Sequence, residues 1–423
     1  MGHAATEFGG PVGTAFMCVF LPGVCYFLLA ACNGEGGCVA WADPLGSVKW
    51  SSLALPLASG PVFSLEACQV VMGWLALCVG LHVILPGKRL EGVQLPDGSR
   101  LTYKLNAMSV FVAIGVLTAA GGHTSTVDLT WVPRNFTALL TAATAFAFAM
   151  SALLYAGSFV GSRLLAQHGT SGWPTYDFFM GRELNPRVGA LDLKEFCELT
   201  PGLIGWLMLD VCFAYTEYKQ TGALSWAMAC VTVFHGVYVA DALWFERAIL
   251  TTMDITTDGF GFMLAFGDLV WVPFTYSLQA RYLLERPQAL SAPFLAVICA
   301  IKVSGYWIFR GSNSQKDQFR RDPTHPSVAH LKVMPTERGT RLIISGWWGV
   351  ARHINYFGDW FMSWSWCLPC GFDHVLPYFY VIYFGALLVH RNARDDANCR
   401  AKYGKDWDKY CAAVPYALIP GLF

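Results

Sequence analysis

Apolar residues occur in long runs along this chain, and short polar segments separate the runs. A run of about 20 apolar residues is the length that an α-helix needs to cross a lipid bilayer. The pattern therefore predicts membrane-spanning helices at residues 13–32, 61–85, 107–121, 136–160, 202–218, 223–245, 259–284 and 293–309. A last apolar stretch, 360–389, contains Pro369, Gly371 and Pro377, which favour a hairpin of shorter helices. The expected total is about ten spanning segments.

The composition supports a membrane protein. The chain has 423 residues, of which 55% are hydrophobic and only 14% are charged, against roughly 25% charged residues in soluble domains. The 29 basic and 29 acidic residues cancel, so no overall field favours nucleic acid as a partner. The first apolar run is longer than a signal-peptide core and lacks a convincing cleavage site, so we expect it to be a spanning helix. The predicted fold class is all-α, a polytopic integral protein of the lipid bilayer, without a Rossmann domain.

The basic residues of the loops predict an orientation, because lysine and arginine accumulate on the cytoplasmic side. Two loops are rich in them, through Lys88, Arg89, Arg100 and Lys104 and through Arg310, Lys316, Arg320 and Arg321. The loops expected on the opposite side, at 33–59 and 121–135, hold only Lys49 and Arg134. We therefore expect a cytoplasmic amino terminus, with the polar region 311–341 and the carboxyl-terminal tail on the same side.

The 14 cysteines lie mostly inside apolar runs. This placement favours small buried side chains rather than disulfides or zinc ligands. Cys367 and Cys370 form one CxxC pair, for which a structural role is the simpler interpretation. Gly259, Gly261 and Gly267 make a loose glycine pattern within a predicted span, where close helix packing is the expected use.

One stretch, LIISGWWGVARHINYFGD at 342–359, is unusually polar for its apolar surroundings. If it is helical, Trp348, Arg352, Asn355 and Asp359 share one face, because they follow one another at i, i+4, i+7 and i+11. A flat ring, a guanidinium, an amide and a carboxylate on one face can stack on and hydrogen-bond a polar, planar, anionic ligand.

The same stretch carries a resemblance to a known family. SGWWG followed by RHxNYxGD is similar to the second signature of the sterol reductases, and GWPTYDFFMGRELNPR at 172–187 is similar to the first. The carboxyl-terminal block RNARDDANCRAKYGKDWDKYCAAVPYALIPGLF, 391–423, resembles the same family. These matches occur in the family's order and span about half the chain, which is more specific than an isolated motif. For the polar loop 172–187 we expect a bracing role rather than a catalytic one.

The resemblance implies NADPH as the cofactor and names its contacts. SNxQKxxFR, which holds Lys316 and Arg320, is similar to the segment that contacts the adenosine phosphate, and two cations one helical turn apart can converge on a 2′-phosphate. Topology alone is the other explanation for these cations. The other cofactor contacts implied by the resemblance are Ile343, Trp348, Asn355, Tyr356, Arg391, Asp395, Cys399, Arg400, Ala401, Lys402, Tyr403 and Tyr410. Helical spacing alone also allows the charges from Arg391 onward to be a solvated helix end.

Carboxylates inside a membrane are costly, so each is a candidate for function. Asp210, Glu217, Asp241, Glu246, Asp254, Asp258 and Asp268 lie in or beside three consecutive segments. Reducing an unactivated C=C bond requires an acid as well as a hydride. Tyr238 and Asp241, with His235 one turn earlier, are the candidate proton donors, in a segment, YVADALW, that resembles the family's sterol pocket. A buried network that only locks neighbouring helices is the alternative.

We therefore predict an NADPH-dependent sterol reductase of the endoplasmic reticulum membrane, or of the cytoplasmic membrane in a bacterium. The C14–C15 double bond is the favoured substrate bond, because Trp347 and the short 321–341 loop resemble the Δ14 type, and the Δ7 reductases are the alternative. A membrane methyltransferase using S-adenosylmethionine and a non-enzymatic sterol-binding protein are rivals of other classes. We expect the amino-terminal helices in 1–250 and the cofactor and sterol pockets in 251–423.

Overall fold

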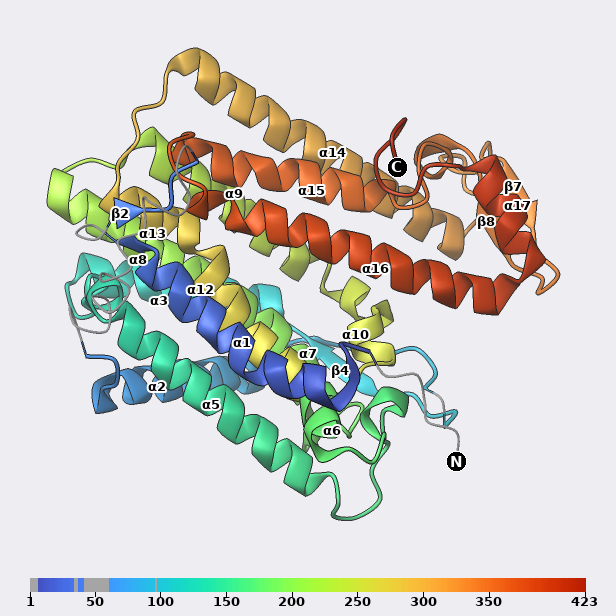
Figure 1. Cartoon of the computed structure of the whole chain (residues 1–423), viewed down its shortest axis with the longest axis horizontal. Coiled ribbons are helices and arrows are strands. Elements are labelled where there is room, and N and C mark those ends of the chain that lie inside the picture. The colour runs from blue at the N-terminus through green and yellow to red at the C-terminus, as the bar shows by residue number, and fades with distance from the viewer. Residues whose placement is uncertain (1–6, 34–36, 42–60, 96) are drawn as a thin grey trace. The chain divides into compact units, whose positions relative to one another are not determined.

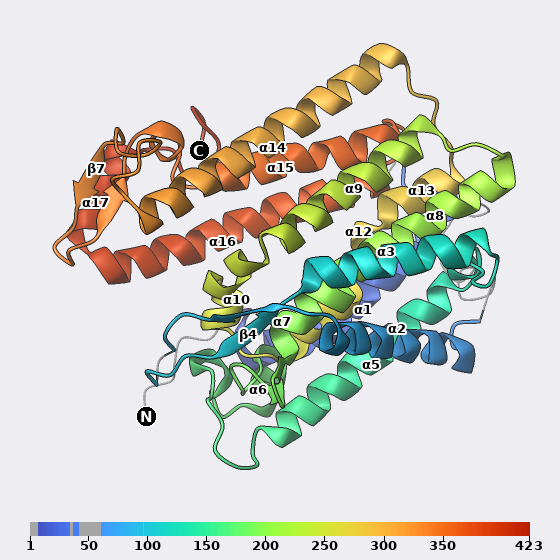
Figure 2. The same cartoon turned by 180° about the vertical axis from the view of Figure 1, so that it is seen from behind.

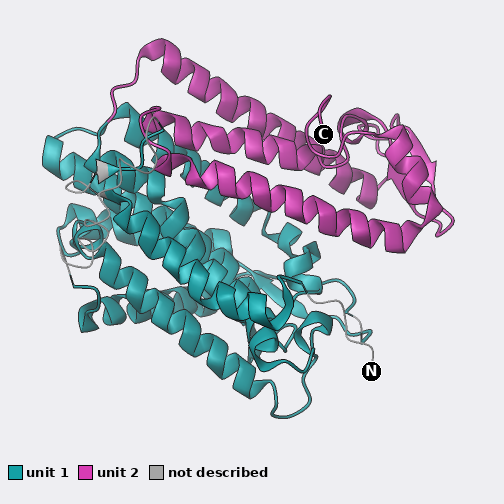
Figure 3. Cartoon of the chain, in the orientation of Figure 1, with its two compact units in different colours: residues 1–287 teal, residues 288–423 magenta. Residues whose placement is uncertain are grey.

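A computed structural model describes residues 7–33, 37–41, 61–95 and 97–423 (Figures 1 and 2). The chain divides into two compact units, 1–287 and 288–423 (Figure 3). The sequence analysis instead divides the chain at residue 250, with the cofactor and sterol pockets in 251–423. That placement of the pockets stays a prediction.

The first unit is helical, with short two-stranded hairpins between helices. Its long helices are α1 Gly10–Ala30, α2 Leu65–Ile84, α3 Ala107–His123, α5 Phe136–Gly157, α8 Gly205–Thr221 and α9 Trp226–Trp244. Its short helices are α4 Trp131–Arg134, α6 Pro174–Met180, α7 Leu193–Cys197, α10 Met253–Thr256, α11 Phe262–Phe266, α12 Val272–Tyr276 and α13 Leu278–Glu285. The antiparallel strand pairs are β1 Cys32–Asn33 with β2 Gly37–Cys38, β3 Lys88–Glu91 with β4 Thr102–Leu105, and β5 Arg187–Val188 with β6 Leu191–Asp192.

The second unit contains three long helices and a small polar end. Its helices are α14 Ala292–Arg321, α15 Ile354–Cys367, α16 Phe379–Tyr403 and α17 Lys405–Ala413, and its strands are β7 Val333–Pro335 and β8 Arg341–Ile343, which pair antiparallel. In both views α14, α15 and α16 lie side by side (Figures 1 and 2). The predicted break after residue 360 is confirmed, because 3₁₀ turns at Leu368–Cys370 and Leu376–Tyr378 separate α15 from α16. The second helix is longer than predicted, since α16 has 25 residues.

Serine caps explain where several membrane helices begin. The hydroxyl oxygens of Ser64, Ser225 and Ser291 each accept a hydrogen bond from a backbone N–H in the first turn of α2, α9 and α14. Such caps satisfy donors that a helix leaves without an intrahelical partner.

Six described helices are long and apolar enough to cross a membrane, and Ala107–His123 is a shorter apolar helix. The chain is therefore a membrane protein by helix length and composition, whereas the count of about ten spans stays a prediction. The segment predicted at 259–284 is helical but irregular, since a π-helical turn at Gly267–Trp271 joins α11 to α12 and Ser277 alone separates α12 from α13.

One cysteine prediction is wrong. Cys32 and Cys38 form a disulfide that closes the β1–β2 hairpin. The disulfide depends on the pairing of β1 with β2, which no apolar pattern reveals. Cys367 and Cys370 are buried thiols.

Glycines bring α14 and α15 together. A Cβ atom on Gly305 would lie 2.6 Å from the backbone nitrogen of Met362, and one on Gly358 would lie 2.7 Å from that of Phe309. Only a residue without a side chain allows such an approach, which is how small residues pack membrane helices. This contact places the end of α14 beside the start of α15, where the predicted cofactor residues lie.

Candidate active site

The last turns of α14 carry two basic side chains that make no ion pair with a carboxylate in the described part of the chain, Lys316 and Arg320. The Lys316 Nζ atom lies 3.9 Å from the centre of the Trp348 ring, a cation–π contact. The neighbouring Arg321, in contrast, is paired with Asp317, with 2.6 Å between Nη2 and Oδ2. Lys316 and Arg320 therefore remain available for an anionic ligand.

The segment before α15 is not one helix, so the predicted shared face is wrong in part. Gly346 has φ +60°, a 3₁₀ turn covers Gly346–Gly349, and α15 begins only at Ile354. The turn is held against α14, because Trp348 Nε1 donates to the Ser312 carbonyl at 2.9 Å and Trp347 N donates to Gln315 Oε1 at 3.0 Å. Trp348 is thus next to Lys316, but it does not belong to the helix that carries Asn355.

Arg352 is directed to the carboxyl-terminal tail rather than to the Asn355 face. Its Nη1 donates to the Val414 and Pro415 carbonyls, at 2.8 Å each. The backbone N–H groups of Arg352 and His353 donate to the Tyr416 and Ala417 carbonyls at 2.9 and 2.8 Å. The Arg352 guanidinium and these two backbone N–H groups are therefore used by carbonyls of the tail. The bonds hold the tail against the start of α15.

Two predicted residues open α15 and face other elements of the unit. Asn355 Nδ2 donates to Asn313 Oδ1 on α14, at 3.4 Å. Its Oδ1 atom is buried and has no hydrogen-bond partner among the described residues. A buried acceptor without a donor is costly, so it suits a ligand that brings an N–H group.

Tyr356 connects α15 to α16. Its hydroxyl donates to Asp395 Oδ2 at 2.8 Å. Burial, together with the charge of Asp395, raises the pKa of the Tyr356 hydroxyl. The His353 ring stacks on the Tyr356 ring with centroids 4.8 Å apart, and burial lowers the pKa of His353 to about 4. The imidazole is therefore neutral at pH 7, and the hydroxyl keeps its proton.

The remaining predicted residues fall into separate groups. Ile343 packs with Trp348 in a buried cluster, while Cys399 and Tyr403 pack against a second cluster that contains Tyr410. Arg391, Asp395, Cys399 and Tyr403 lie along α16, as the helical spacing predicted. Arg400 faces elsewhere, because it pairs with Asp396 and Asp408 at 2.8 and 2.7 Å, and Ala401 and Lys402 are exposed.

An apolar cavity of about 290 Å³ borders this polar region. Side chains of α15 and α16 and two residues of the tail line it: Tyr356, Phe357, Trp360, Trp364, Val381, Ile382, Gly385, Ala386, Leu388, Val389, Leu418 and Ile419. Since Tyr356 belongs to both, the second unit places apolar space directly beside its polar site.

The candidate proton donors lie in the first unit, on α9. Tyr238 is half-buried and Asp241 is 9% exposed. His235 Nδ1 lies 2.8 Å from Asp210 Oδ2 on α8, and both side chains are fully buried. The predicted group on α9 thus extends to a second helix.

A family model described as "Ergosterol biosynthesis ERG4/ERG24 family" matches residues 3–423. The chain belongs to this family. It is 47% identical to "Delta(14)-sterol reductase TM7SF2" of Mus musculus, covering 100% of this chain and 98% of the mouse protein. It is 47% identical to "Delta(14)-sterol reductase erg24" of Schizosaccharomyces pombe, covering 99% and 97%. It is 44% identical to "Delta(14)-sterol reductase LBR" of Gallus gallus, covering 98% of this chain and 63% of that protein. The resemblance drawn from the motifs is confirmed.

The first signature of this ERG4/ERG24 family chain forms a brace. Asp177 Oδ1 accepts hydrogen bonds from the Ser171 backbone N–H and hydroxyl, at 2.8 Å each, and Arg182 Nη1 lies 3.5 Å from Asp177 Oδ2. Gly181 has φ +85°, and a Cβ atom there would lie 2.3 Å from the backbone nitrogen of Gly261. The signature therefore holds α6 against the backbone that precedes α11.

The sequence did not reveal which side chains contact several of the predicted site residues. Asn313 and His353 lie inside quoted motifs, but no pattern showed that they contact Asn355 and Tyr356. Asp210 is one of the carboxylates in an apolar segment, and this position is the sequence signal that marks it as a candidate. Its pairing with His235 depends on how α8 and α9 pack.

Proposed function

We propose that this chain reduces the C14–C15 double bond of a sterol with NADPH as the hydride source. The observation that carries the proposal is the pair Lys316 and Arg320, which lack carboxylate partners in the described chain while the adjacent Arg321 has one. Family membership supplies the substrate class, since several relatives are named Delta(14)-sterol reductases.

The residues of the second unit fit a phosphorylated nicotinamide cofactor. Lys316 and Arg320 would hold its 2′-phosphate, because ammonium and guanidinium groups make charge-assisted bonds to phosphate. Asn355 would accept a hydrogen bond from an amide N–H of the cofactor, because its buried Oδ1 has no donor among the described residues. Tyr356, Arg391 and Asp395 would complete the site. When bound, the reduced nicotinamide supplies a hydride, the two electrons that the double bond gains.

Tyr238 supplies the proton in this proposal. Its O–H bond breaks, and the electron pair of the C14–C15 double bond forms the new C15–H bond, so that C14 becomes positively charged. A neighbouring C8 double bond stabilises that charge until C14 receives the hydride. Asp241, buried one turn along α9, holds the relay that returns a proton from solvent to the phenolate.

The proposed orientation places the amino terminus and the cofactor residues at the cytoplasmic side, where reduced nicotinamide cofactor is available. The basic loops support it through the positive-inside rule. The Cys32–Cys38 disulfide, at the opposite end of α1 from the amino terminus, suits an oxidising compartment. The proposed location is the endoplasmic reticulum membrane in a eukaryote, or the cytoplasmic membrane in a bacterium.

The proposal is tested with purified protein, NADPH, and Δ14, Δ7 and Δ24 sterols. We expect reduction of the Δ14 substrate, with deuterium from labelled NADPH at C14 and deuterium from deuterated water at C15. Tyr238→Phe should lower turnover roughly 100-fold with sterol and cofactor binding little changed. Tyr215→Phe is the matched control, because it removes a tyrosine hydroxyl of the same unit that donates a hydrogen bond to the Gly122 carbonyl. Reduction of a Δ7 sterol alone, or exchanged label positions, would refute the assignment.

A further inference from the structure

Asp210 on α8 and His235 on α9 are ionisable side chains that contact each other and are fully buried. Their hydrogen bond, 2.8 Å between Oδ2 and Nδ1, joins the helices within apolar surroundings. Taking an aspartate and a histidine out of water is costly, and functional need is the usual reason for keeping such groups inside a membrane protein.

The pair is a poor device for stability. Asp210 Oδ1 is buried, and no described residue provides it with a hydrogen bond. A buried ionisable pair that leaves the Asp210 Oδ1 acceptor without a described donor is costly, and apolar replacements of such pairs are often neutral or stabilising. Interhelical hydrogen bonds in membranes are also weak on average. Holding α8 to α9 is therefore an insufficient reason for these residues.

The pair contacts the surroundings of Tyr238. Trp206, one turn before Asp210 on α8, is fully buried, and its ring centroid lies 4.7 Å from that of His235 and 6.0 Å from that of Tyr238. Tyr238 follows His235 by one turn of α9, and long side chains on a helix point back toward its amino terminus. The Trp206 ring thus contacts both the His235 ring and the Tyr238 ring.

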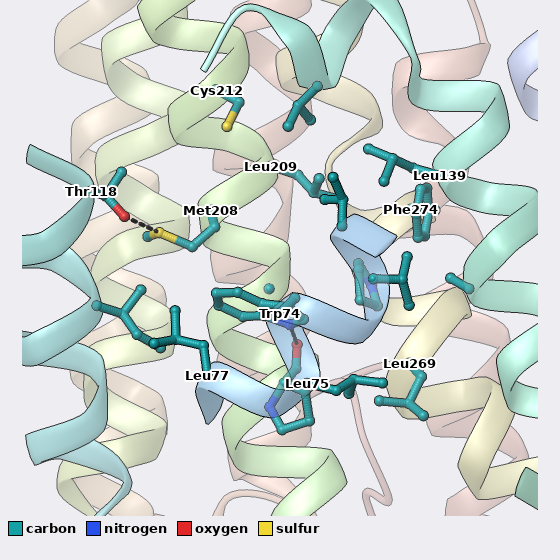
Figure 4. A pocket seen from close by; sticks show the side chains of 18 of the residues that line it. Trp74, Leu75, Leu77, Thr118, Leu139, Met208, Leu209, Cys212, Leu269 and Phe274 are labelled. Atoms are coloured by element: carbon teal, nitrogen blue, oxygen red, sulfur yellow. Dashed lines mark hydrogen bonds between the residues drawn. The ribbon is translucent and has the colours of Figure 1, made fainter. Parts of the chain in front are cut away.

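The opposite face of α8 has a different environment. Met208, Leu209 and Cys212 line an apolar cavity of about 320 Å³ between α8, α2, α3 and α5 (Figure 4). Polar groups at this cavity are used internally, since Trp74 Nε1 donates to the Pro201 carbonyl at 3.3 Å and the Thr118 hydroxyl donates to Met208 Sδ at 3.5 Å. Asp210 does not line this cavity. Its carboxylate is hydrogen-bonded to His235 on α9.

We propose that Asp210 is a positioning residue for Tyr238, an inference that rests on the proposed role of Tyr238 as proton donor. The hydrogen bond between Asp210 Oδ2 and His235 Nδ1 fixes the orientation of the imidazole. The fixed imidazole holds the Trp206 ring, and Trp206 holds the phenol ring of Tyr238 in the orientation that proton transfer requires. Neither Asp210 nor His235 touches the substrate in this assignment.

The first test replaces the pair with apolar side chains, Asp210→Leu with His235→Leu. We expect thermal stability equal to or above that of the wild type, NADPH affinity and sterol KM within about twofold, and kcat lowered by about 100-fold, the scale of a misplaced reacting group. Cys212→Ala, on the other face of α8, is the control and should keep its kcat. A Leu pair with normal kcat overturns the inference, as does a loss of stability with normal kcat per folded molecule.

The second test asks whether Asp210 acts through Tyr238. Asp210→Asn, which keeps the size of the side chain and serves if the Leu pair does not fold, is combined with Tyr238→Phe in a double-mutant cycle. We expect Asp210→Asn to lower kcat at least about tenfold in the wild type and less than about threefold in the Phe background. Equal effects in both backgrounds overturn the inference while leaving the proposed function intact. Near-normal turnover of Tyr238→Phe itself would instead refute the proposed proton donor.

Discussion

Cofactor choice is the property that the second unit predicts most directly. Replacing Lys316 and Arg320 with alanine, singly and together, removes the two cations that lack carboxylate partners in the described chain. We expect a loss of NADPH affinity with little change for NADH, because only NADPH carries the 2′-phosphate that these groups would neutralise.

The expected magnitude follows from exposure. Hydrogen bonds to charged groups contribute about 1.5–3 kcal/mol each. Lys316 is half-buried against Trp348, which reduces solvent screening, so we expect about 2 kcal/mol, or roughly 30-fold in Kd. Arg320 is exposed and better screened, so we expect about 1 kcal/mol, or roughly fivefold. The double variant should lose roughly 150-fold if the two effects add.

The assay is titration of each variant with NADPH and with NADH at two salt concentrations. Arg321→Ala is the matched control, because Arg321 is already paired with Asp317 and should have little effect. Higher salt should weaken NADPH binding to the wild type more than to the double variant. Equal losses for both cofactors, or an Arg321→Ala effect as large as that of Lys316→Ala, would refute the phosphate assignment.

Four further changes address other parts of the second and first units. Asn355→Asp places a carboxylate at the buried acceptor and Arg391→Gln removes a cation from α16, so each should abolish turnover in a protein that circular dichroism shows folded; a normal rate would make these residues structural. Removing residues 416–423 takes away the carbonyl acceptors of the Arg352 and His353 N–H groups, and NADPH affinity measured by titration should fall at least about tenfold, the scale of a lost hydrogen-bonded anchor. Burial raises the pKa of Glu246, which accepts hydrogen bonds from the backbone N–H groups that open α3, from 4.5 to about 7. The folded state then binds the Glu246 proton more tightly than the unfolded state. This residue's contribution to stability is therefore present below pH 4.5 and is lost as pH rises to about 7. In thermal melts across that range, the melting temperature of Glu246→Gln should fall less with rising pH than that of the wild type.

The sequence by itself determined where most helices lie. In a bilayer every backbone polar group must be satisfied internally, so a long apolar run has few alternatives to a helix. The runs at 65–84, 136–157 and 226–244 lie within the predicted bounds. The break between α15 and α16 was also predictable, because Pro369, Gly371 and Pro377 disfavour a continuous helix by local chemistry. The motifs alone were sufficient to indicate the family.

Only the tertiary structure decided how the polar residues are used. Periodicity placed Arg352 on the face of Asn355, yet its guanidinium and N–H bind carbonyls of the tail more than 60 residues away. The Cys32–Cys38 disulfide, the Tyr356–Asp395 bond and the Asp210–His235 pair likewise join separate elements. A sequence pattern reports which side chains share one helix face, because that depends on local geometry. Which donor meets which acceptor depends on how helices approach one another, and here glycines such as Gly305 and Gly358 set that approach through contacts between distant parts of the chain.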